Sequence, residues 1–309
     1  MKILVTGGAG FIGSTLVDRL LALGHQVVII DDLSSGKKEY INPEAKFYQM
    51  DLSAPKIEEI FAIQKFDYVY HLAAQIDVRK SVANPTEDNR VNVLGGVNIL
   101  ENCLKHQVKK IIFSSTGGAI YGETENVPTP ETCPPNPLSP YGIHKLTFEK
   151  YLNYYHQVYG QRYTILRFAN VYGPRQYKGG EAGVVSIFVE NAVNGKKSLI
   201  NGDGLQTRDY VYVDDVVAAL VKAMEVDYNG ALNVGTGLEK NLIDVMTLIE
   251  LSLGKRVEKE HVAGKLGEQR RSCLRCDEIK KVLSWEPQVD LATGIKRTVE
   301  WTKSLGVNV

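Results

Sequence analysis

The sequence predicts an α/β protein in which a doubly wound parallel sheet is followed by a smaller C-terminal α/β substrate domain. A glycine-rich turn, Gly7 to Gly13, lies between a short β-branched apolar run and an amphipathic segment. Strand-like runs alternate with helical patterns through most of the chain, as in a parallel sheet covered on both faces. The second run ends in Asp31-Asp32, and the combination of strand, turn, helix and acid indicates a Rossmann-like unit.

The composition limits the classes of partner. The chain of 309 residues is 44% hydrophobic and can bury one large core or two coupled ones. Its 36 basic residues balance 36 acidic ones, so no field of one sign attracts nucleic acid or an anionic membrane. No apolar run approaches membrane-spanning length, and Gly7 to Gly10 interrupts the first run too early for a signal peptide. We expect a cytoplasmic protein without nucleic-acid or membrane partners.

The cysteines do not predict a structural role. Four of them in a chain of this length do not make a disulfide framework. Cys273-x-x-Cys276 is a single pair and lacks the second ligand pair that a structural zinc site needs. We therefore expect no metal site.

The glycine-rich turn predicts dinucleotide binding. Glycines allow a backbone angle that side chains forbid, close approach of a pyrophosphate, and tight packing of helix on strand. The N–H groups that open the following helix can bind the anion. An ordinary glycine turn would not require the acid after the second strand, where Asp31, rather than Asp32, is expected to accept hydrogen bonds from a ribose diol. Because a carboxylate there repels a 2′-phosphate, NAD is favoured over NADP.

Further site residues are expected where the later strands end. Strand-like runs cover 26–30, 45–50, 67–71, 110–114 and 163–167. Ligands of such sheets bind at the carboxyl ends of the strands. Asp51-Leu52 follows one run, where a carboxylate can meet the adenine amino group. Small residues at 71–75 let a cofactor lie against the backbone, and a Ser/Thr cluster at 114–118 follows the next run.

A tyrosine and a lysine carry the predicted chemistry. Ser139-Pro140 is a helix start, and Tyr141 and Lys145 are four residues apart on one face of that helix. A free phenol has a pKa of about 10, and one ammonium about 4 Å away stabilises its anion by about 4 kcal/mol at an effective dielectric constant near 20. With a cationic nicotinamide nearby, the pKa of Tyr141 approaches neutrality and the phenol can accept a proton. A Tyr–Lys pair at this spacing also occurs as plain packing.

These motifs, together with Arg167-Phe168-Ala169-Asn170-Val171-Tyr172-Gly173-Pro174, resemble the extended short-chain dehydrogenase/reductases, and among them the nucleotide-sugar enzymes of the UDP-glucose 4-epimerase type. The resemblance implies an NAD-binding domain over 1–170, to which 210–237 returns, and a nucleotide-sugar-binding domain over 171–309. It also implies a homodimer formed by the helices that begin near Asn92 and Tyr141.

The resemblance implies three sets of site residues. The catalytic set is Tyr141, Lys145 and Thr116, with Ser115 as the alternative hydroxyl. The cofactor set is Gly7, Gly10, Phe11, Ile12, Gly13, Asp31, Asp32, Leu33, Ser34, Ser35, Gly36, Asp51, Leu52, Leu72, Ala73, Ala74, Gln75, Asn92, Ser114, Ser115, Tyr141, Lys145 and Ala169. The UDP-sugar set is Thr116, Gly117, Gly118, Tyr141, Asn170, Gly183, Val184, Val185, Arg208 and Arg270.

In the UDP-sugar set, Arg208 and Arg270 would clamp the diphosphate, because a buried diphosphate needs fixed cationic groups. The competing interpretations are a local Arg208-Asp209 ion pair and a solvated surface at Arg270-Arg271. Ser272 falls where some relatives carry a bulky residue beside the sugar 2-substituent, so an N-acetylated sugar is a candidate substrate beside UDP-glucose.

Residue types near Thr116 distinguish the reactions of this family. Its dehydratases and decarboxylases carry an acid directly after the strand-end Ser/Thr, whereas this chain has Gly117-Gly118. The sequence therefore favours 4-epimerisation through a 4-keto intermediate over elimination or decarboxylation. A catalytically silent NAD-sensing scaffold is the alternative from another class, and it would have no need of Tyr141, Lys145 and Thr116 together.

Overall fold

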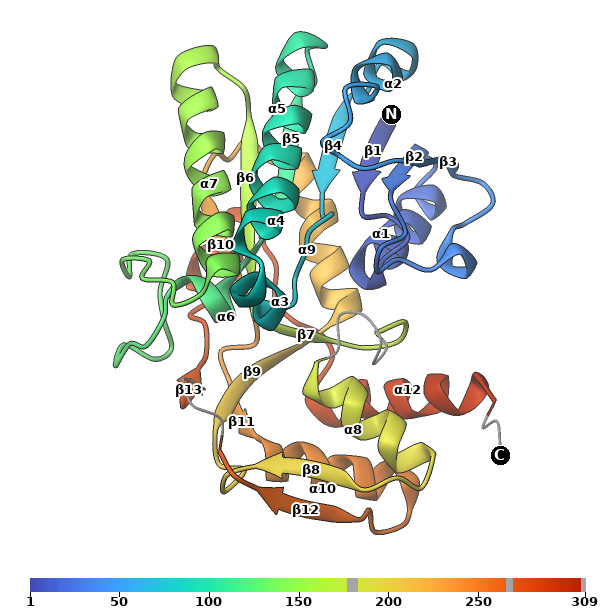
Figure 1. The fold of residues 1–309 in the computed structure, drawn as a ribbon, viewed down its shortest axis with the longest axis vertical. Coiled ribbons are helices and arrows are strands. Elements are labelled where there is room, and N and C mark those ends of the chain that lie inside the picture. The colour runs from blue at the N-terminus through green and yellow to red at the C-terminus, as the bar shows by residue number, and fades with distance from the viewer. Residues whose placement is uncertain (177–182, 265–268, 307–309) are drawn as a thin grey trace.

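The structure, a computed structural model, describes residues 1–176, 183–264 and 269–306. Within them a seven-stranded parallel sheet forms the larger unit (Figure 1), which confirms the predicted fold class. In sheet order its strands are β10 (Ala231–Val234), β6 (Tyr163–Phe168), β5 (Lys110–Thr116), β4 (Tyr68–His71), β1 (Lys2–Thr6), β2 (Gln26–Asp31) and β3 (Lys46–Gln49).

The order of the strands creates a switch point between β1 and β4. The chain builds outward from β1 through β2 to β3, then crosses to the other side of β1 and continues with β4, β5 and β6. Ligands of open parallel sheets bind in the crevice at the carboxyl ends of the two strands that flank such a switch. These ends face the smaller unit of the molecule (Figure 1).

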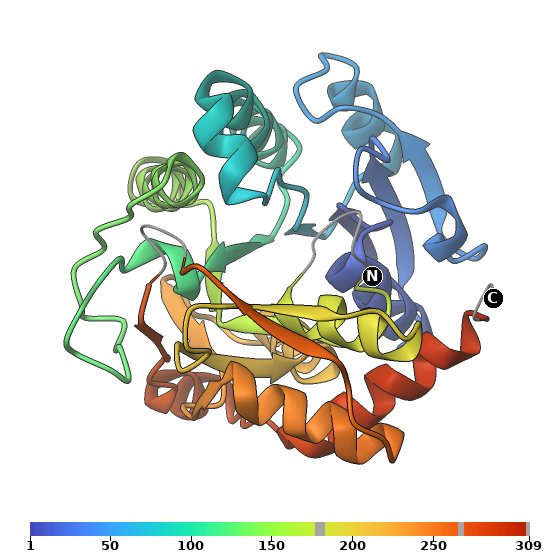
Figure 2. The same cartoon turned by 60° about the horizontal axis from the view of Figure 1, so that its bottom comes forward.

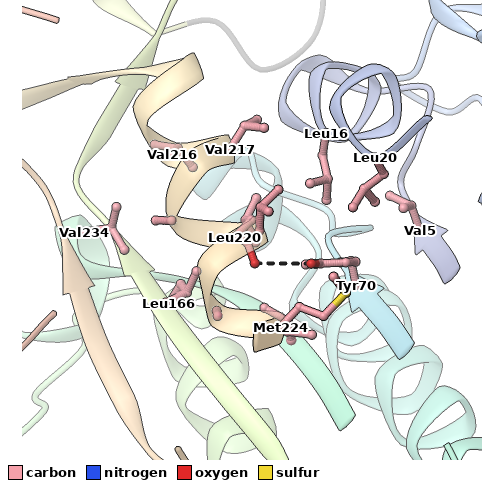
Figure 3. Packing of buried hydrophobic residues seen from close by; sticks show 14 of the residues in the cluster. Val5, Leu16, Leu20, Tyr70, Leu166, Val216, Val217, Leu220, Met224 and Val234 are labelled. Atoms are coloured by element: carbon pink, nitrogen blue, oxygen red, sulfur yellow. Dashed lines mark hydrogen bonds between the residues drawn. The ribbon is translucent and has the colours of Figure 1, made fainter. Parts of the chain in front are cut away.

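Both faces of the sheet are buried, as the β-branched runs predict. Residues of β1 alternate, with Ile3 and Val5 in one core cluster and Leu4 in the other. Figure 3 shows the first cluster, where the Tyr70 hydroxyl donates to the Leu220 carbonyl oxygen at 3.2 Å. Its helices are α1 (Phe11–Ala22), α9 (Val213–Glu225) and α11 (Asp277–Leu283). The helices of the second cluster are α2 (Ile57–Gln64), α5 (Gly95–Lys105) and α7 (Pro140–Tyr159).

Helix α7 begins and ends at the residues that its sequence indicates. The Ser139 hydroxyl accepts from the Gly142 N–H at 3.2 Å, and Pro140 occupies the first turn. Gly160, at φ 72°, ends the helix in the left-handed conformation. The predicted helix start is thereby confirmed.

Short helical segments lie between the longer elements of the larger unit. They are the 3₁₀ turn η1 (Lys38–Tyr40), helices α3 (Val78–Ala83), α4 (Pro85–Asn89) and α6 (Gly117–Ile120), and the π-helical segment η2 (Arg90–Leu94). The sequence places the end of β5 at Ser114, but the strand continues to Thr116. Ser114, Ser115 and Thr116 therefore point to alternate faces of the sheet rather than forming one loop.

The smaller unit packs three helices on short strands, and Figure 2 brings it to the front. Strand β9 pairs with β7, β11 and β13, and β8 pairs with β12. The strands are β7 (Asn170–Tyr172), β8 (Ser198–Asn201), β9 (Thr207–Tyr212), β11 (Glu239–Asn241), β12 (Lys259–Val262) and β13 (Arg271–Ser272). The helices are α8 (Val184–Val193), α10 (Leu242–Leu253) and α12 (Leu291–Ser304).

Candidate functional site

A cavity of about 220 Å³ opens at the carboxyl ends of β1, β2 and β4, where the switch point lies. Many of the predicted cofactor residues line it together: Gly7, Gly10, Asp31, Asp32, Ser34, Ser35, Asp51, Leu52, Leu72, Ala73, Ala74 and Gln75. The cavity also contains residues that the sequence did not single out. These come from the segment 76–91 and include Lys80, Glu87, Arg90 and Val91.

The glycine-rich turn is too crowded for side chains. Gly7 has φ +72°, and a Cβ added there would lie 2.6 Å from the Ala73 backbone nitrogen. A Cβ on Gly13 would lie 2.0 Å from the Gly7 carbonyl oxygen. The first turn of α1 therefore lies directly on the loop that follows β1, and its N-terminal N–H groups face the cavity end where Gly10 lies.

Gly7→Ala is expected to destabilise the protein by well over about 3 kcal/mol, because backbone overlap adds to the cost of a left-handed alanine. Gly24→Ala is a matched control, since Gly24 has φ +78° but nothing within 4 Å of its added Cβ. It should cost only about 1 to 2 kcal/mol. Urea unfolding of both variants measures the difference, and equal losses would show that the contact with Ala73 is unimportant.

Two backbone hydrogen bonds fix the Asp31 carboxylate in the cavity wall. Its carboxylate accepts from the N–H groups of Ala9 and Leu33 at 3.0 and 2.8 Å. Burial raises the pKa of Asp31, although these two hydrogen bonds act in the opposite direction. The Asp32 carboxylate instead accepts from the backbone and hydroxyl of Ser34 at 2.8 and 2.6 Å on the exposed side. The Asp31 carboxylate and the close-packed glycine turn in one cavity fit the ribose and pyrophosphate of NAD.

Asp51 lies at the outer part of the same cavity. It accepts two hydrogen bonds from Ser53, both at 2.7 Å, and one from the Arg90 guanidinium at 2.8 Å. Although partial burial opposes it, these donors lower the pKa of Asp51. A carboxylate offers about four acceptor sites, so one is left for a further donor, and the contact of Asp51 with the adenine amino group stays a prediction.

Hydrogen bonds fix the loop after β4 to η2 and, through Asp88, to α7. The Asn92 side-chain amide hydrogen-bonds the backbone N–H and carbonyl of Gln75 at 3.0 and 2.8 Å. The Gln75 side chain donates to the buried carboxylate of Asp88 at 2.5 Å. The same carboxylate contacts His144 Nδ1 at 2.5 Å, one residue before Lys145. Asn92 thus supports the cavity wall rather than lining it.

Tyr141 and Lys145 lie together at the start of α7. Lys145 is buried, its Nζ lies 5.9 Å from the centroid of the Tyr141 ring, and it donates to the Ser114 carbonyl oxygen at 3.0 Å. A Cβ on Gly142 would lie 2.6 Å from the Ala119 carbonyl oxygen, so the first turn of α7 packs directly against α6. Tyr141 is thereby held beside the carboxyl end of β5.

The structure favours Thr116 over Ser115 as the hydroxyl at that strand end. Ser115 points into the core and donates to the buried Glu149 carboxylate at 2.6 Å. Thr116 is half-buried and caps α6 by accepting from the Ala119 N–H at 3.1 Å. A Cβ on Gly118 would lie 4.0 Å from Thr116 Oγ1 and 3.8 Å from Asn170 Oδ1, which places these two polar side chains next to the same open space.

The two arginines of the predicted diphosphate clamp, Arg208 and Arg270, have different surroundings. Arg208 on β9 lies opposite Ser272 on β13, and its guanidinium donates to the Thr207 carbonyl oxygen at 2.7 Å. The neighbouring Asp209 points into the core and accepts from Thr236 and Gly237, so it is not an ion-pair partner of Arg208. Arg270 makes an exposed, bidentate pair with Asp203, both distances being 2.9 Å. Its contact with a diphosphate stays a prediction.

The remaining predicted residues frame the site. Phe11 is buried in the cluster of the smaller unit, against which Ile12 packs. The Ala169 N–H donates to the Val234 carbonyl oxygen at 2.9 Å, and Leu33 adopts φ +62° beside Asp31. Gly36 lies against the Asp31 carboxylate, and Gly117 against Leu274. Gly183 caps α8, in which Val185 is fully buried and Val184 half-buried.

The described part of the chain contains neither a candidate metal site nor a helix that could cross a membrane. Residues 1–176, 183–264 and 269–306 contain no group of three or more His, Cys, Asp or Glu side chains that could hold a metal ion. Cys273 and Cys276 are free thiols, and burial raises the pKa of both. Among the same residues, no helix combines the length and the apolar character needed to cross a bilayer.

The parallel sheet, the glycine-rich turn with Asp31 in the same cavity, and the Tyr141–Lys145 pair define an extended short-chain dehydrogenase/reductase. A family model described as the NAD dependent epimerase/dehydratase family matches residues 3–235. The chain belongs to this family.

Three relatives agree with this assignment. The chain is 45% identical to a UDP-glucose 4-epimerase of Mycolicibacterium smegmatis over 310 residues, covering 98% of this chain and 99% of the relative. A crystal structure of the Thermotoga maritima UDP-glucose 4-epimerase with UDP-glucose matches with a TM-score of 0.97 at 48% identity, covering 99% of both chains. The Thermus thermophilus UDP-glucose 4-epimerase, solved with NAD, matches with a TM-score of 0.94 at 42% identity, covering 98% and 99%.

Proposed function

We propose that this protein is an NAD-dependent 4-epimerase that interconverts UDP-glucose and UDP-galactose through a 4-keto sugar. The observation that carries the proposal is the buried Lys145 ammonium beside the Tyr141 ring and on the Ser114 carbonyl oxygen, two residues before Thr116 at the end of β5. The relatives named UDP-glucose 4-epimerase, one of them solved with UDP-glucose, support this choice of substrate.

The side chains of this protein account for the proton transfers. NAD, when bound, supplies the hydride acceptor and donor for C4 of the sugar. Tyr141 accepts the proton of the 4-hydroxyl and later returns it to the 4-keto oxygen. The buried ammonium of Lys145 stabilises the phenolate form of Tyr141, and Thr116 holds the reacting oxygen in place. One acid–base group is sufficient because the reaction is redox-neutral.

Arg208 and Asn170 would hold the UDP part of the substrate. Arg208 is on the strand that pairs with β7, whose first residue is Asn170, so both side chains belong to one small sheet. This sheet lies on the side of the molecule that faces the carboxyl ends of the large sheet (Figure 1). A guanidinium fixed there suits a diphosphate.

Conversion of UDP-galactose and UDP-glucose by the purified protein tests the proposal. We expect both directions to proceed without net formation of NADH, as measured by product analysis together with absorbance at the NADH maximum. Steady accumulation of NADH, or a dehydrated 4-keto-6-deoxy sugar, would assign another reaction of the family. No product from either sugar, with NAD retained, would favour the NAD-sensing scaffold.

An N-acetylated hexose is the second candidate substrate. Ser272 is a small residue, and its register partner on β9 is Arg208. If the sugar is held beside Arg208, Ser272 leaves space for a bulky 2-substituent. UDP-N-acetylglucosamine should then be epimerised in the same assay, and complete absence of turnover with this sugar would remove the candidate.

We also propose a homodimer formed by α5 and α7. Large apolar side chains of α7 are exposed along one helical face, including Ile143 (47%), Tyr154 (48%) and Val158 (55%). Leu94, directly before α5, is 54% exposed. A face of this kind suits an interface with a second copy of the chain. Light scattering should give the mass of a dimer, whereas a monomer at micromolar concentration would contradict the proposal.

A further inference from the structure

The outer end of the cofactor cavity offers a binding surface of its own. Starting from the pyrophosphate at the glycine-rich turn and the ribose at Asp31, the next group of the cofactor is the adenine ring. The cavity beyond Asp31 is lined by the apolar side chains of Met50, Leu52 and Val91, and by the guanidinium-bearing Arg90. This end therefore combines apolar side chains with one planar cation and the carboxylates of Asp51 and Glu87.

The edges of the Arg90 guanidinium are already occupied. Nε and one terminal nitrogen donate to Glu87 at 2.8 and 2.7 Å. The other terminal nitrogen donates to Asp51 at 2.8 Å and to the Ser53 hydroxyl at 2.7 Å. Since an arginine has five N–H donors in one plane, four are used, and the orientation of that plane is fixed. Since one edge donor is left, the face of the guanidinium is the larger part of the group that a ligand in the cavity can use.

The π-helical backbone at Arg90 supports a binding role for this residue. Arg90 opens the π-helical segment η2, inserted between α4 and α5. Segments of this type are rare and occur often at functional sites. The same segment carries Asn92, which fixes the backbone of Gln75 in the cavity wall. One local distortion thus positions two groups toward the cofactor.

We propose that Arg90 is a stacking platform for the adenine ring, held in plane by Glu87 and Asp51, and that it disfavours a 2′-phosphate because four of its five N–H donors are already used. The inference rests on NAD being the cofactor. Guanidinium planes stack on aromatic rings through cation–π attraction. The carboxylates that line the cavity, among them Glu87, Asp51 and Asp31, also outnumber its two cationic side chains, Arg90 and Lys80, and leave it with an excess of negative charge.

Calorimetric titration of the cofactor-free protein with NAD tests the proposal. Arg90→Ala and Arg90→Lys should each weaken NAD binding by about tenfold, because lysine keeps the charge but not the plane. The loss should be nearly independent of salt concentration. Arg79→Ala is the matched control, because this exposed arginine in α3 also contacts a carboxylate, Asp77, but does not line the cavity. It should bind NAD as the wild type does.

Glu87→Gln tests whether the occupied donors of Arg90 disfavour NADP, and it leaves Arg90 itself in place. The amide replaces one acceptor oxygen by an NH2 group, which frees one edge donor of Arg90 and removes a negative charge, and this should raise the affinity for NADP relative to NAD by several-fold. Wild-type affinity in Arg90→Lys would show that charge alone matters, and unchanged affinity in a folded Arg90→Ala would remove the platform. A loss confined to NADP would mean that Arg90 reads a phosphate. If the wild-type protein binds no NAD, the proposed function fails together with the platform. If it binds NAD and Arg90→Ala binds NAD equally well, only the platform fails.

Discussion

Tyr141→Phe is expected to lower the epimerase turnover number by about 10³-fold while NAD remains bound, because the variant loses one hydroxyl and little volume. The buried ammonium of Lys145 would still lie beside the ring, 5.9 Å from its centroid. Since proton transfer is lost rather than substrate binding, the KM for UDP-galactose should change little. Initial rates over a range of UDP-galactose concentrations measure both parameters.

Tyr151→Phe is the matched control for this variant. Tyr151 lies on the same helix, is partly exposed, and should keep wild-type activity after the same chemical change. Cofactor content after gel filtration shows whether Tyr141→Phe still binds NAD. A Tyr141→Phe enzyme with more than about a tenth of the wild-type rate would show that another group accepts the proton, and the mechanism proposed here would be wrong.

The parts of the site that depend on local sequence could be predicted. The glycine-rich turn, the acid at the end of β2 and the Ser139-Pro140 helix start are each determined by residues close in the chain. Gly7 needs its left-handed backbone angle whatever the distant residues are, and Asp31 follows from the length of one strand–helix–strand unit. These features fix where the cavity lies.

The parts that depend on distant partners could not be predicted. Whether Ser115 or Thr116 faces the site depends on how far β5 continues, and on Glu149, which lies 34 residues away. The pairing of Arg270 with Asp203 joins residues 67 apart, and no sequence spacing reveals it. Arg90 carries no motif either, and only the π-helical turn and the contact with Asp51 show its place in the cavity.

Loss of one partner of the buried ion pair between Arg167 and Glu149 should strongly destabilise the protein. The Arg167 guanidinium donates to Glu149 at 3.0 and 2.6 Å, and both side chains are less than one-tenth exposed. Ser115 donates to the same carboxylate, and the other terminal nitrogen of Arg167 donates to the Tyr121 hydroxyl at 2.9 Å. Burial raises the pKa of Tyr121 to about 12, so the phenol stays neutral. The network joins β5, β6 and α7.

Glu149→Ala is therefore expected to lower the free energy of unfolding by about 3 to 5 kcal/mol, because it leaves the buried charge of Arg167 without a counterion. Urea unfolding measures this loss. The double variant Glu149→Leu, Arg167→Met should recover much of it, since well-packed apolar residues can replace a buried pair. A loss below about 1 kcal/mol in Glu149→Ala would show that water reaches Arg167. Glu149 lies one helical turn after Lys145 in α7. A local loss of structure at Glu149 would therefore also displace the Lys145 ammonium, on which the reactivity of Tyr141 depends.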